Sequence, residues 1–545
     1  MLTLTHPGIA DTAAWDRAGI ALPSYDAKAA AENTKRSPAW LHFGAGNIFR
    51  GFIAALGDTV LGQDAGNAGV IAVETFDTEI IEKIYAPYDS LALLVTLLPD
   101  GKTERRVIGS IAEGLTASRE NGDFTKLQRY FEAGSLQMAS FTITEKGYAL
   151  HKPDGALLDI VARDMETGPL GRQTSAAGDT HVMSLIAALL YARFQKNGAP
   201  IAMVSMDNCS HNGDKLKAAV TEIAAAWSGK GLIDAGFLDY LADASRVSFP
   251  WSMIDKITPR PAPLIGDALA RDGIGGMDTV ITAKGTYIAA FVNAEGPQYL
   301  VIEDAFPNGR PALERAGVYF TDRQTVDKVE RMKVTTCLNP LHTALAVFGC
   351  LLGHTSIAGE MRDAQLAALV RRIGYDEGLP VVTDPGILDP KAFIGEVLTK
   401  RLPNPFIPDT PQRIATDTSQ KISIRYGETV KAYMADPARS VDTLVGIPLV
   451  IAGWLRYLLG VDDEGKEMEL SDDPLLPTLQ AALSGVRVGD PAGAEGKLPP
   501  ILRNQAIFGT DLVAAGLGDK IEGYFRRMLE DRGAVRKLLT EVFPA

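Results

Sequence analysis

Cysteine and histidine are scarce in this chain, whose 545 residues include three cysteines and seven histidines. The three cysteines, Cys209, Cys337 and Cys350, are too few for a disulfide framework in so long a chain. No CxxC pair and no cysteine–histidine cluster has the spacing of a zinc site. We therefore expect neither a disulfide scaffold nor a bound metal.

Positive charge is also in short supply, because 54 lysines and arginines stand against 67 aspartates and glutamates, a formal net charge of −13. Nucleic acid binding requires clustered lysine and arginine, so the composition argues against a nucleic acid partner. The acidic balance also means that a site for an anionic substrate would depend on a few local cations.

Long apolar runs are missing as well. No run reaches the roughly 18 residues that cross a bilayer, and one of the richest, Ser184–Ala192, ends at Arg193. The N-terminus lacks the basic start and apolar core of a secretory signal. We expect a cytoplasmic protein without a membrane partner.

The chain is longer than one hydrophobic core usually fills, which predicts two large domains. From Ala39 onward, short apolar runs alternate with helical patterns, and this alternation predicts an α/β domain with a mainly parallel, Rossmann-type sheet. The runs are AWLHF, GVIAV, LALLVTLL, QMASFTIT and IAMVSM. After about residue 315, helical periods take over, in 341–352, 364–373, 447–459 and 521–539.

These patterns predict three segments. We expect an N-terminal extension at 1–38, a Rossmann-like domain at 39–314 with a hairpin insertion near 273–296, and a mostly α-helical substrate domain at 315–545. The glycine- and proline-rich stretch 486–500 predicts a surface loop within the last of these.

Ligands of open α/β sheets bind beyond the carboxyl ends of the strands, so the residues that follow each apolar run are informative. Four runs are followed by glycines, carboxylates or an amide, namely Gly44-Ala45-Gly46, Glu74, Glu145 and Asp207-Asn208. Each could be ordinary loop chemistry by itself, but together they predict a cofactor crevice.

The segment LHFGAGNIFRGF predicts a pyrophosphate site, because Gly44 and Gly46 allow close approach of a phosphate to the backbone. The same segment would bring Asn47, Phe49 and Arg50 to the cofactor, although Phe49 stands where a third glycine is usual. A tight strand-to-helix turn is the alternative interpretation. Glu74, at the end of the next strand, could bind an adenosine ribose and repel a 2′-phosphate, which favours NAD over NADP.

The stretch Lys333-Val-Thr-Thr-Cys-Leu-Asn339-Pro340-Leu-His342 precedes an apolar helical pattern. Asn339 before Pro340 is typical of a helix N-cap with proline at the first helical position. Lys333 and His342 would then lie on either side of this helix start, so that the three polar side chains of Lys333, Asn339 and His342 could converge. The alternative is a surface lysine, a capping asparagine and a half-buried histidine.

Lys333, Asn339 and His342 resemble the catalytic motif of the polyol-specific long-chain dehydrogenases, which include mannitol 2-dehydrogenase, fructuronate reductase and tagaturonate reductase. This chain has one more residue between the lysine and the asparagine than the family pattern. Six further blocks extend the resemblance over most of the chain: FGAGNIFRGF, ITEKGY, SMDNCSHNGD, FPWSMIDKITP, VIEDAFPNGRPALERAGVYF and NPFIPDTPQRIATDTSQKI.

The resemblance implies roles for individual residues. Lys333 would be the general base, and Asn208 and Asn339 would stabilise the alkoxide. His342 would orient substrate hydroxyls. Glu145 and Asp255 match acidic residues of the family's site region, with salt bridges in a loop as the alternative.

Arg413 and Lys421 match a substrate-binding pair of the family. A guanidinium can hold a carboxylate through two parallel hydrogen bonds, and an ammonium can reinforce it. The alternative is ion pairs with Asp409 or Asp417. Because the mannitol enzymes carry a similar pair, these cations do not by themselves identify an acid as the substrate.

The long form of the chain resembles the fructuronate reductases, which implies an enzyme that interconverts D-fructuronate and D-mannonate. Glu74 predicts NAD as its cofactor, and the family resemblance implies a monomer. Mannitol 2-dehydrogenase and tagaturonate reductase are alternatives within the family. A non-catalytic sensor of sugar acids is an alternative of another class, although a sensor needs no proton acceptor. A P-loop phosphotransferase does not fit, because GAGNIFRG lacks the Gly-Lys-Ser/Thr ending.

Overall fold

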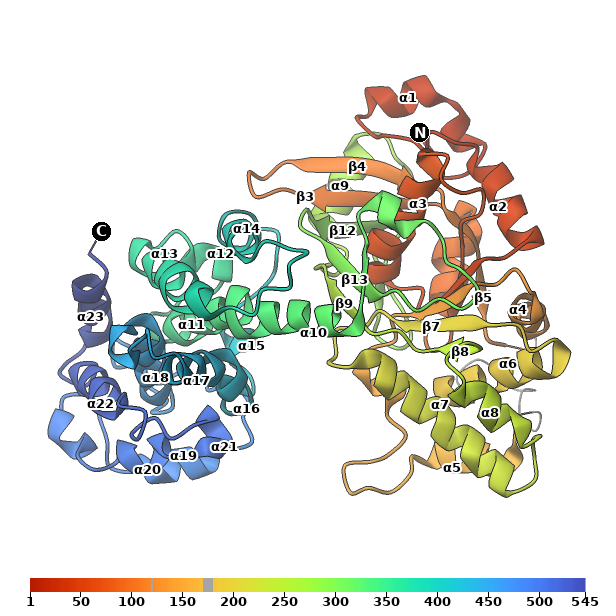
Figure 1. Ribbon diagram of the computed structural model, residues 1–545. Coiled ribbons are helices and arrows are strands. Elements are labelled where there is room, and N and C mark those ends of the chain that lie inside the picture. Colours follow the sequence, from red (N-terminus) through yellow and green to blue (C-terminus); the bar gives the residue numbers. More distant parts are fainter. Residues whose placement is uncertain (119–120, 170–179, 545) are drawn as a thin grey trace. The chain divides into compact units, whose positions relative to one another are not determined.

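The structure is a computed structural model that describes residues 1–118, 121–169 and 180–544 (Figure 1). The chain divides into two compact units. Unit 1 comprises Met1–Leu97 and Lys102–Asp327, and unit 2 comprises Leu98–Gly101 and Lys328–Ala545. The main division comes at Asp327 rather than at residue 314, because β14 (Tyr319–Thr321) still pairs with a strand of unit 1, β13 (Tyr299–Glu303).

Unit 1 contains a six-stranded, all-parallel sheet in the order β5-β2-β1-β6-β7-β8. Its strands are β1 (Trp40–Phe43), β2 (Val70–Glu74), β5 (Ile111–Thr116), β6 (Met138–Phe141), β7 (Ile201–Ser205) and β8 (Val247–Ser248). The sheet confirms the predicted Rossmann-type fold, and four of the five apolar runs form its strands.

The fifth run, LALLVTLL, forms β3 (Ala92–Leu97), which lies outside this sheet. It pairs with β12 (Phe291–Glu295) in parallel and with β4 (Thr103–Ile108) in antiparallel orientation. An apolar run shows that a strand is buried, but its partner depends on contacts distant in sequence, so the pattern could not assign the sheet.

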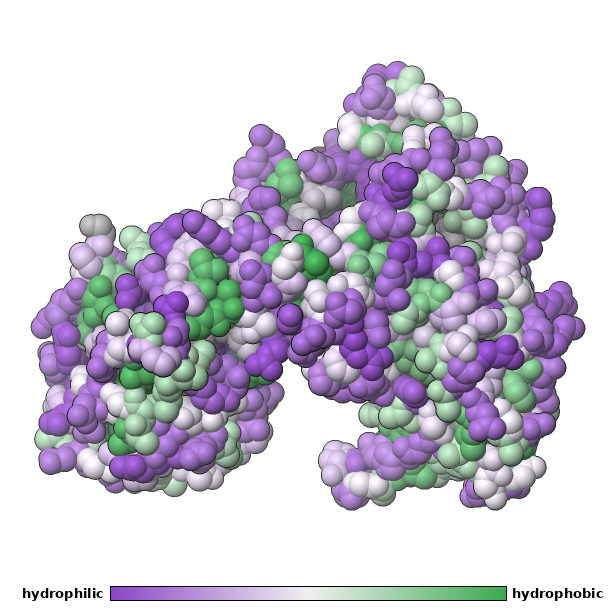
Figure 2. All heavy atoms as spheres, viewed as in Figure 1, coloured by the Kyte–Doolittle hydropathy of each residue, from purple (hydrophilic) through white to green (hydrophobic). Residues whose placement is uncertain are grey.

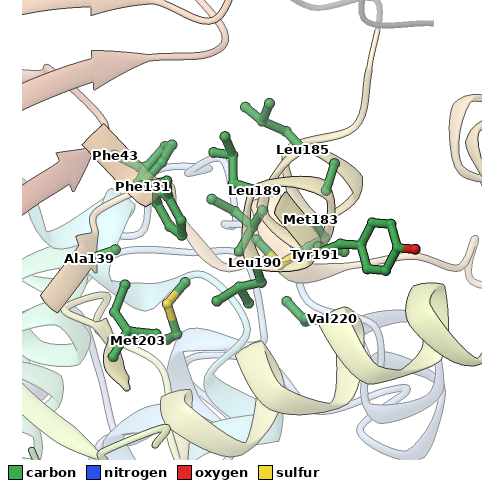
Figure 3. Close-up of a cluster of buried hydrophobic side chains, with 14 of the residues drawn as sticks. Phe43, Phe131, Ala139, Met183, Leu185, Leu189, Leu190, Tyr191, Met203 and Val220 are labelled. Atoms are coloured by element: carbon green, nitrogen blue, oxygen red, sulfur yellow. The ribbon is translucent and has the colours of Figure 1, made fainter. Parts of the chain in front are cut away.

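Alternate residues of the main sheet fill two cores, as the two-residue period of a strand requires. Phe43 faces α4 (Asp123–Glu132), α6 (Val182–Lys196) and α7 (Asn212–Gly229), and Figure 3 shows side chains of this cluster. Trp40 faces the second core with α3 (Ala54–Gly62). Inside the first core, the buried Arg193 side chain donates hydrogen bonds to five backbone carbonyls, which satisfies its charge without a carboxylate.

The N-terminal segment packs on unit 1 through α1 (Thr12–Arg17) and α2 (Ala27–Arg36). Trp15 of α1 is fully buried, and the Thr34 hydroxyl of α2 accepts a hydrogen bond from Gly69 N, just before β2. The remaining elements of unit 1 are α5 (Asp159–Thr167), α8 (Gly236–Ala242), β9 (Ser252–Asp255) and α9 (Pro263–Arg271).

The predicted hairpin is shorter than the 273–296 insertion. It consists of β10 (Val280–Ile281) and β11 (Tyr287–Ile288), whereas 291–295 is β12. Its turn lies against the segment that follows β2, where the Thr282 hydroxyl donates to the Asp77 carboxylate and Ala283 N donates to Glu79. The insertion therefore borders the carboxyl end of β2.

Unit 2 is helical, as the periodicity predicts. Four predicted periods correspond to α11 (Asn339–Leu351), α13 (Ala364–Arg371), α18 (Gly446–Tyr457) and the pair α22 (Gly518–Arg527) and α23 (Ala534–Val542). Gly533, with φ +77°, separates the last two helices, so the fourth period is interrupted. The shorter helices are α12 (Ile357–Glu360), α14 (Pro390–Glu396), α15 (Pro411–Ala415), α16 (Thr418–Ile422), α17 (Glu428–Ala435), α19 (Leu476–Ala482), α20 (Leu498–Leu502) and α21 (Gln505–Phe508).

Among the described residues, one helical stretch, Arg323–Leu351, is long and apolar enough to cross a membrane by length and composition. Within its most apolar window, 83% of the residues are buried inside the structure, as in the core helix of a soluble protein. The stretch combines α10 (Arg323–Met332), the π-helical turn η7 (Lys333–Cys337) and α11. On the face of the molecule shown in Figure 2, apolar residues lie in small groups among hydrophilic ones.

Candidate active site

The glycine segment after β1 is held close to the neighbouring strand ends. Gly44 has φ +103°, and a Cβ there would lie 2.1 Å from the Thr142 carbonyl oxygen, so only glycine fits. A Cβ at Gly46 would meet nothing within 4 Å. The segment therefore leaves open space at Gly46, where a phosphate can approach the backbone.

Glu74 ties this segment to the end of β2. Its Oε2 accepts a hydrogen bond from Ala45 N at 3.0 Å, and its Oε1 accepts from the backbone N–H groups of Thr75, Phe76 and Asp77. The side chain is 8% exposed. Each carboxylate oxygen has about two lone pairs. Oε1 already accepts three hydrogen bonds and Oε2 accepts one, so a ribose hydroxyl would donate mainly to Oε2.

Two predicted cofactor residues point into the protein. Phe49 is fully buried and stacks on His42 with ring centroids 4.4 Å apart. Arg50 is 1% exposed, and its guanidinium donates to the Ala289 carbonyl and to Asn47 Oδ1. Both side chains belong to a π-helical turn, Phe49–Ile53, whose five residues are all buried, and their assignment to a cofactor stays a prediction. Asn47 is the partner of Arg50 and lies at the start of this turn.

Asp207, at the end of β7, organises the loop that follows β6. Its carboxylate accepts hydrogen bonds from Ile143 N and Thr144 N, both at 2.9 Å, and from the Tyr148 hydroxyl at 2.6 Å. Burial raises the pKa of Asp207 above its usual value. Thr144 has φ +63°, a conformation that these bonds help to hold. We did not assign Asp207 a role of its own from the sequence, although its place directly after an apolar run was a usable signal.

Asn208 follows Asp207 and is exposed. Asn212 is fully buried, and its Nδ2 donates to the carbonyls of Ser205, Asp207 and Ser252. These bonds fix the ends of β7 and β9 and thereby position the loop that carries Asn208. No sequence pattern distinguished Asn212 from its neighbours either.

The two predicted acidic residues of unit 1 have different surroundings. Glu145 has a 68% exposed side chain and forms an ion pair with Lys215, which is the salt-bridge alternative considered for it. Asp255 is buried at the end of β9, in register with Tyr299 of β13. The structure thus places Glu145 and Asn208 after the adjacent strands β6 and β7, as the strand-end argument requires.

In unit 2, η7 carries Lys333 and leads directly into α11. Leu338 N donates to Lys333 O at 3.1 Å, the five-residue spacing of a π-helix. A π turn contains one residue more than an α turn, so it accommodates the extra residue between Lys333 and Asn339. Lys333 is 5% exposed.

The predicted N-cap at Asn339 is wrong. Leu338 is the capping residue, without a side-chain cap, and Asn339 is the first residue of α11. Leu338, with φ −131° and ψ −61°, departs from helical geometry between η7 and α11, and no side chain caps this break. The Asn339 side chain is therefore not used as a cap; Lys333 lies in η7, and Asn339 and His342 lie in the first turn of α11.

His342 is flanked by charged groups. Its Nε2 lies 3.5 Å from Asp409 Oδ2 and has no hydrogen-bond partner among the described residues. Burial and the nearby guanidinium groups of Arg425, Arg413 and Arg401 lower the pKa of His342 to about 3. His342 is therefore neutral near pH 7, which suits hydrogen bonding to substrate hydroxyls.

The predicted cations Arg413 and Lys421 lie in the same region. Arg413 is 65% exposed and forms an ion pair with Asp409, the alternative that the sequence offered. Lys421 Nζ donates to the Thr416 carbonyl at 2.7 Å, and burial and Arg425 lower the pKa of Lys421. Asp409 thus joins Arg413 to His342. Arg425, four residues after Lys421, was missed, although this spacing on a helical segment was a usable signal.

The chain matches the sequence model of the mannitol dehydrogenase Rossmann domain over residues 38–315 and that of the mannitol dehydrogenase C-terminal domain over residues 325–523. The chain belongs to the mannitol dehydrogenase family. It is an oxidoreductase, and the resemblance noted in the sequence is confirmed.

Relatives span the full chain. A D-mannonate oxidoreductase from Thermotoga maritima is 51% identical over 543 residues, which cover 99% of each chain. The structure of Pseudomonas fluorescens mannitol 2-dehydrogenase, a ternary complex with NAD and D-mannitol, matches with a TM-score of 0.64 and 27% identity over 96% of each chain. A substrate-free D-sorbitol dehydrogenase matches with a TM-score of 0.75 over 96% of this chain and 98% of the other; at 22% identity it shows the fold alone.

Proposed function

We propose that this member of the mannitol dehydrogenase family interconverts D-fructuronate and D-mannonate with NAD(H). The observation that carries the proposal is the 51% identity, over 99% of both chains, to a D-mannonate oxidoreductase. The cations around His342 support it, because a sugar acid brings a carboxylate that an otherwise acidic chain must neutralise.

The proton chemistry is assigned to Lys333. During oxidation of D-mannonate, the hydroxyl proton leaves for the Lys333 side-chain nitrogen while the carbinol carbon loses hydride, and the C–O bond becomes a carbonyl. The carboxamide N–H groups of Asn208 and Asn339 donate to the oxygen as negative charge develops on it. Reduction follows the same path in reverse. A bound nicotinamide dinucleotide supplies the hydride acceptor or donor.

The residues of unit 1 fit such a dinucleotide. The open space at Gly46 and the start of the helical turn after it suit a pyrophosphate. Glu74 stands at the end of β2, where the adenosine ribose binds in this type of fold, and its charge disfavours a 2′-phosphate. We therefore propose NAD(H) as the preferred cofactor.

The test is a substrate and cofactor panel. D-mannonate, D-altronate, D-mannitol and D-arabinitol are assayed with NAD and with NADP, by the absorbance of the reduced nicotinamide. We expect the highest kcat/KM for D-mannonate with NAD. A higher kcat/KM for D-altronate or for either polyol would contradict the substrate assignment, and a preference for NADP would contradict the cofactor assignment.

The panel also separates the enzyme from a sensor of sugar acids. A sensor would bind D-mannonate, seen as heat in a calorimetric titration, but would turn over none of the four compounds. The buried Lys333 favours the enzyme, because ligand binding without chemistry does not require a proton acceptor.

A further inference from the structure

Arg425 carries a charge that no carboxylate of the protein neutralises. It lies in η11 (Ser423–Gly427), a π-helical turn after α16, and is half-buried. Its Nη1 donates to the Thr343 hydroxyl, and within the part of the chain that the structure describes no carboxylate oxygen lies within 4.0 Å of its guanidinium.

Two buried arginines of this protein are compensated by backbone carbonyl groups. Arg193 donates to five backbone carbonyls, and the Arg456 guanidinium donates to the carbonyls of Val461, Asp462 and Met528. Arg413 has Asp409 as its ion partner. In the described part of the chain, Arg425 has a single hydrogen-bond partner, the Thr343 hydroxyl, which binds Nη1. Its other two nitrogens, Nε and Nη2, have no partner among the described residues. Removing a cation partly from water without an anion or hydrogen-bond acceptors beside it destabilises the protein. A ligand that supplies an anion would remove this penalty.

The position of Arg425 relates it to the catalytic motif. The Thr343 hydroxyl, which accepts from Arg425, donates to the carbonyl of Asn339 at 2.9 Å. The neighbouring Tyr426 hydroxyl donates to the Pro340 carbonyl at 2.7 Å. Two successive residues of η11 are thus bonded to the N-terminal part of α11, which carries Asn339 and His342.

The charge of Arg425 also affects the titratable residues near the catalytic motif. After burial, Arg425 is the largest influence that lowers the pKa of both His342 and Lys421. Lys421 and Arg425 are four residues apart along a helical segment, a spacing at which like charges repel. Positive charge is therefore concentrated beside His342, and Arg413 is paired there with Asp409.

We propose that Arg425 binds the carboxylate of the substrate and thereby sets the preference for sugar acids over neutral polyols. Nε and Nη2 form one edge of the planar guanidinium, and this edge matches the two oxygens of a carboxylate. Lys421 lies beside it as a second cation. The inference rests on the proposed function and deepens it, because it names the group that distinguishes an acid from a polyol.

The test compares Arg425→Gln and Arg425→Lys with the parent protein, using D-mannonate and D-mannitol as substrates. The exposed Arg439, which pairs with Asp436, supplies the matched control Arg439→Gln. Thermal unfolding of each variant checks that the protein folds. We expect Arg425→Gln to lower kcat/KM for D-mannonate by about 10- to 100-fold, mainly through KM, since hydrogen bonds to charged groups are worth this much.

The same change should alter kcat/KM for D-mannitol by less than about threefold, because a neutral polyol has no carboxylate to lose. Arg425→Lys should keep part of the preference for acids, since the positive charge remains but the bidentate hydrogen bonding is lost. Arg439→Gln should change neither substrate's kinetics. An equal loss on both substrates, not rescued by lysine, would show that Arg425 only supports Thr343 and α11, and would overturn the proposal.

Failure of the proposed function gives a different result. If the parent prefers a polyol to every acid, D-mannonate is tested as a competitive inhibitor of polyol oxidation. A weaker inhibition constant in Arg425→Gln would still support the carboxylate site, whereas an unchanged constant would overturn it.

Discussion

Lys333 is the residue on which the proposed chemistry depends. It is buried at the first position of η7, where the π turn places it ahead of Asn339 and His342. Lys333→Ala should leave NADH binding nearly intact and lower turnover by about 10² to 10⁴, the usual contribution of a general acid or base. Initial rates, with NADH binding followed by fluorescence, measure both effects.

The asparagines provide the control for Lys333. Asn208→Ala and Asn339→Ala should each lower turnover by about 10² to 10³, the usual cost of losing one donor to a developing oxyanion. If Lys333→Ala kept most of its turnover, the base would have to be another residue.

Glu360, at the end of α12, is a buried acid that the mechanism does not use. It is fully buried, neither carboxyl oxygen has a hydrogen-bond partner among the described residues, and burial raises its pKa from 4.5 to about 9. Between these values the folded protein keeps the proton that the unfolded chain has lost. Glu360 therefore makes the free energy of unfolding fall as pH rises, by about 1.4 kcal/mol per pH unit.

Glu360→Gln should remove this contribution. Urea unfolding at pH 5, 7 and 9 should show that the variant gains stability relative to the parent as pH increases, because glutamine has no proton to lose. The exposed Glu530→Gln is the control and should follow the parent. A constant difference between Glu360→Gln and the parent across pH would mean that the carboxyl is ionised in the folded protein.

At the scale of elements, sequence patterns located most strands and helices but not their fine geometry. The apolar runs identified β1, β2, β6 and β7, because burial on both faces leaves a clear signal. They could not show that β3 joins another sheet, since a strand's partner depends on contacts distant in sequence. The Asn339-Pro340 pair predicted a helix start, which is correct, but the cap position falls one residue earlier, at Leu338, which has no capping side chain. Similarly, Phe49 and Arg50 follow the glycines in sequence, yet their helical turn directs both side chains into the core.

The packing of α11 against α12 depends on a glycine. A Cβ at Gly349 would lie 2.2 Å from Glu360 Oε1 and 2.8 Å from Pro411 Cγ. Gly349→Ala should therefore destabilise the protein by about 1–3 kcal/mol, the usual cost of overpacking, despite the better helix propensity of alanine. Chemical denaturation measures the change.

Two further variants make this prediction specific. Gly523→Ala, in α22, meets nothing within 4 Å and should stabilise the protein by about 0.5–1 kcal/mol. Gly349→Ala combined with Glu360→Ala should cost less than the sum of the single changes, because removing the carboxyl makes room for the methyl group. Additive effects would show that the two positions do not touch.

At the scale of the whole molecule, the sequence predicted the strand ends better than the groups that surround the reacting atoms. Gly44, Glu145 and Asn208 follow parallel strands of one sheet and Glu74 ends another, because consecutive runs of an α/β pattern place their carboxyl ends at one edge. Asp207, Asn212 and Arg425 were not assigned roles. They act through hydrogen bonds and charges between segments far apart in the chain, which a local pattern does not encode.

The composition of the whole chain leads to a last prediction, that activity does not require a metal ion. Seven histidines and three cysteines offer no zinc spacing, and among the described residues no three histidine, cysteine, aspartate or glutamate side chains gather as metal ligands would. The lysine assigned as base can accept the proton without Lewis-acid help, and two asparagines can stabilise the alkoxide. Dialysis against EDTA should therefore leave kcat, KM and the unfolding temperature unchanged, and added Mg²⁺ or Zn²⁺ should not raise the rate. A loss of rate on dialysis that one of these ions reverses would instead place a metal at the reacting oxygen, and the roles given to Lys333 and the asparagines would have to be reassigned.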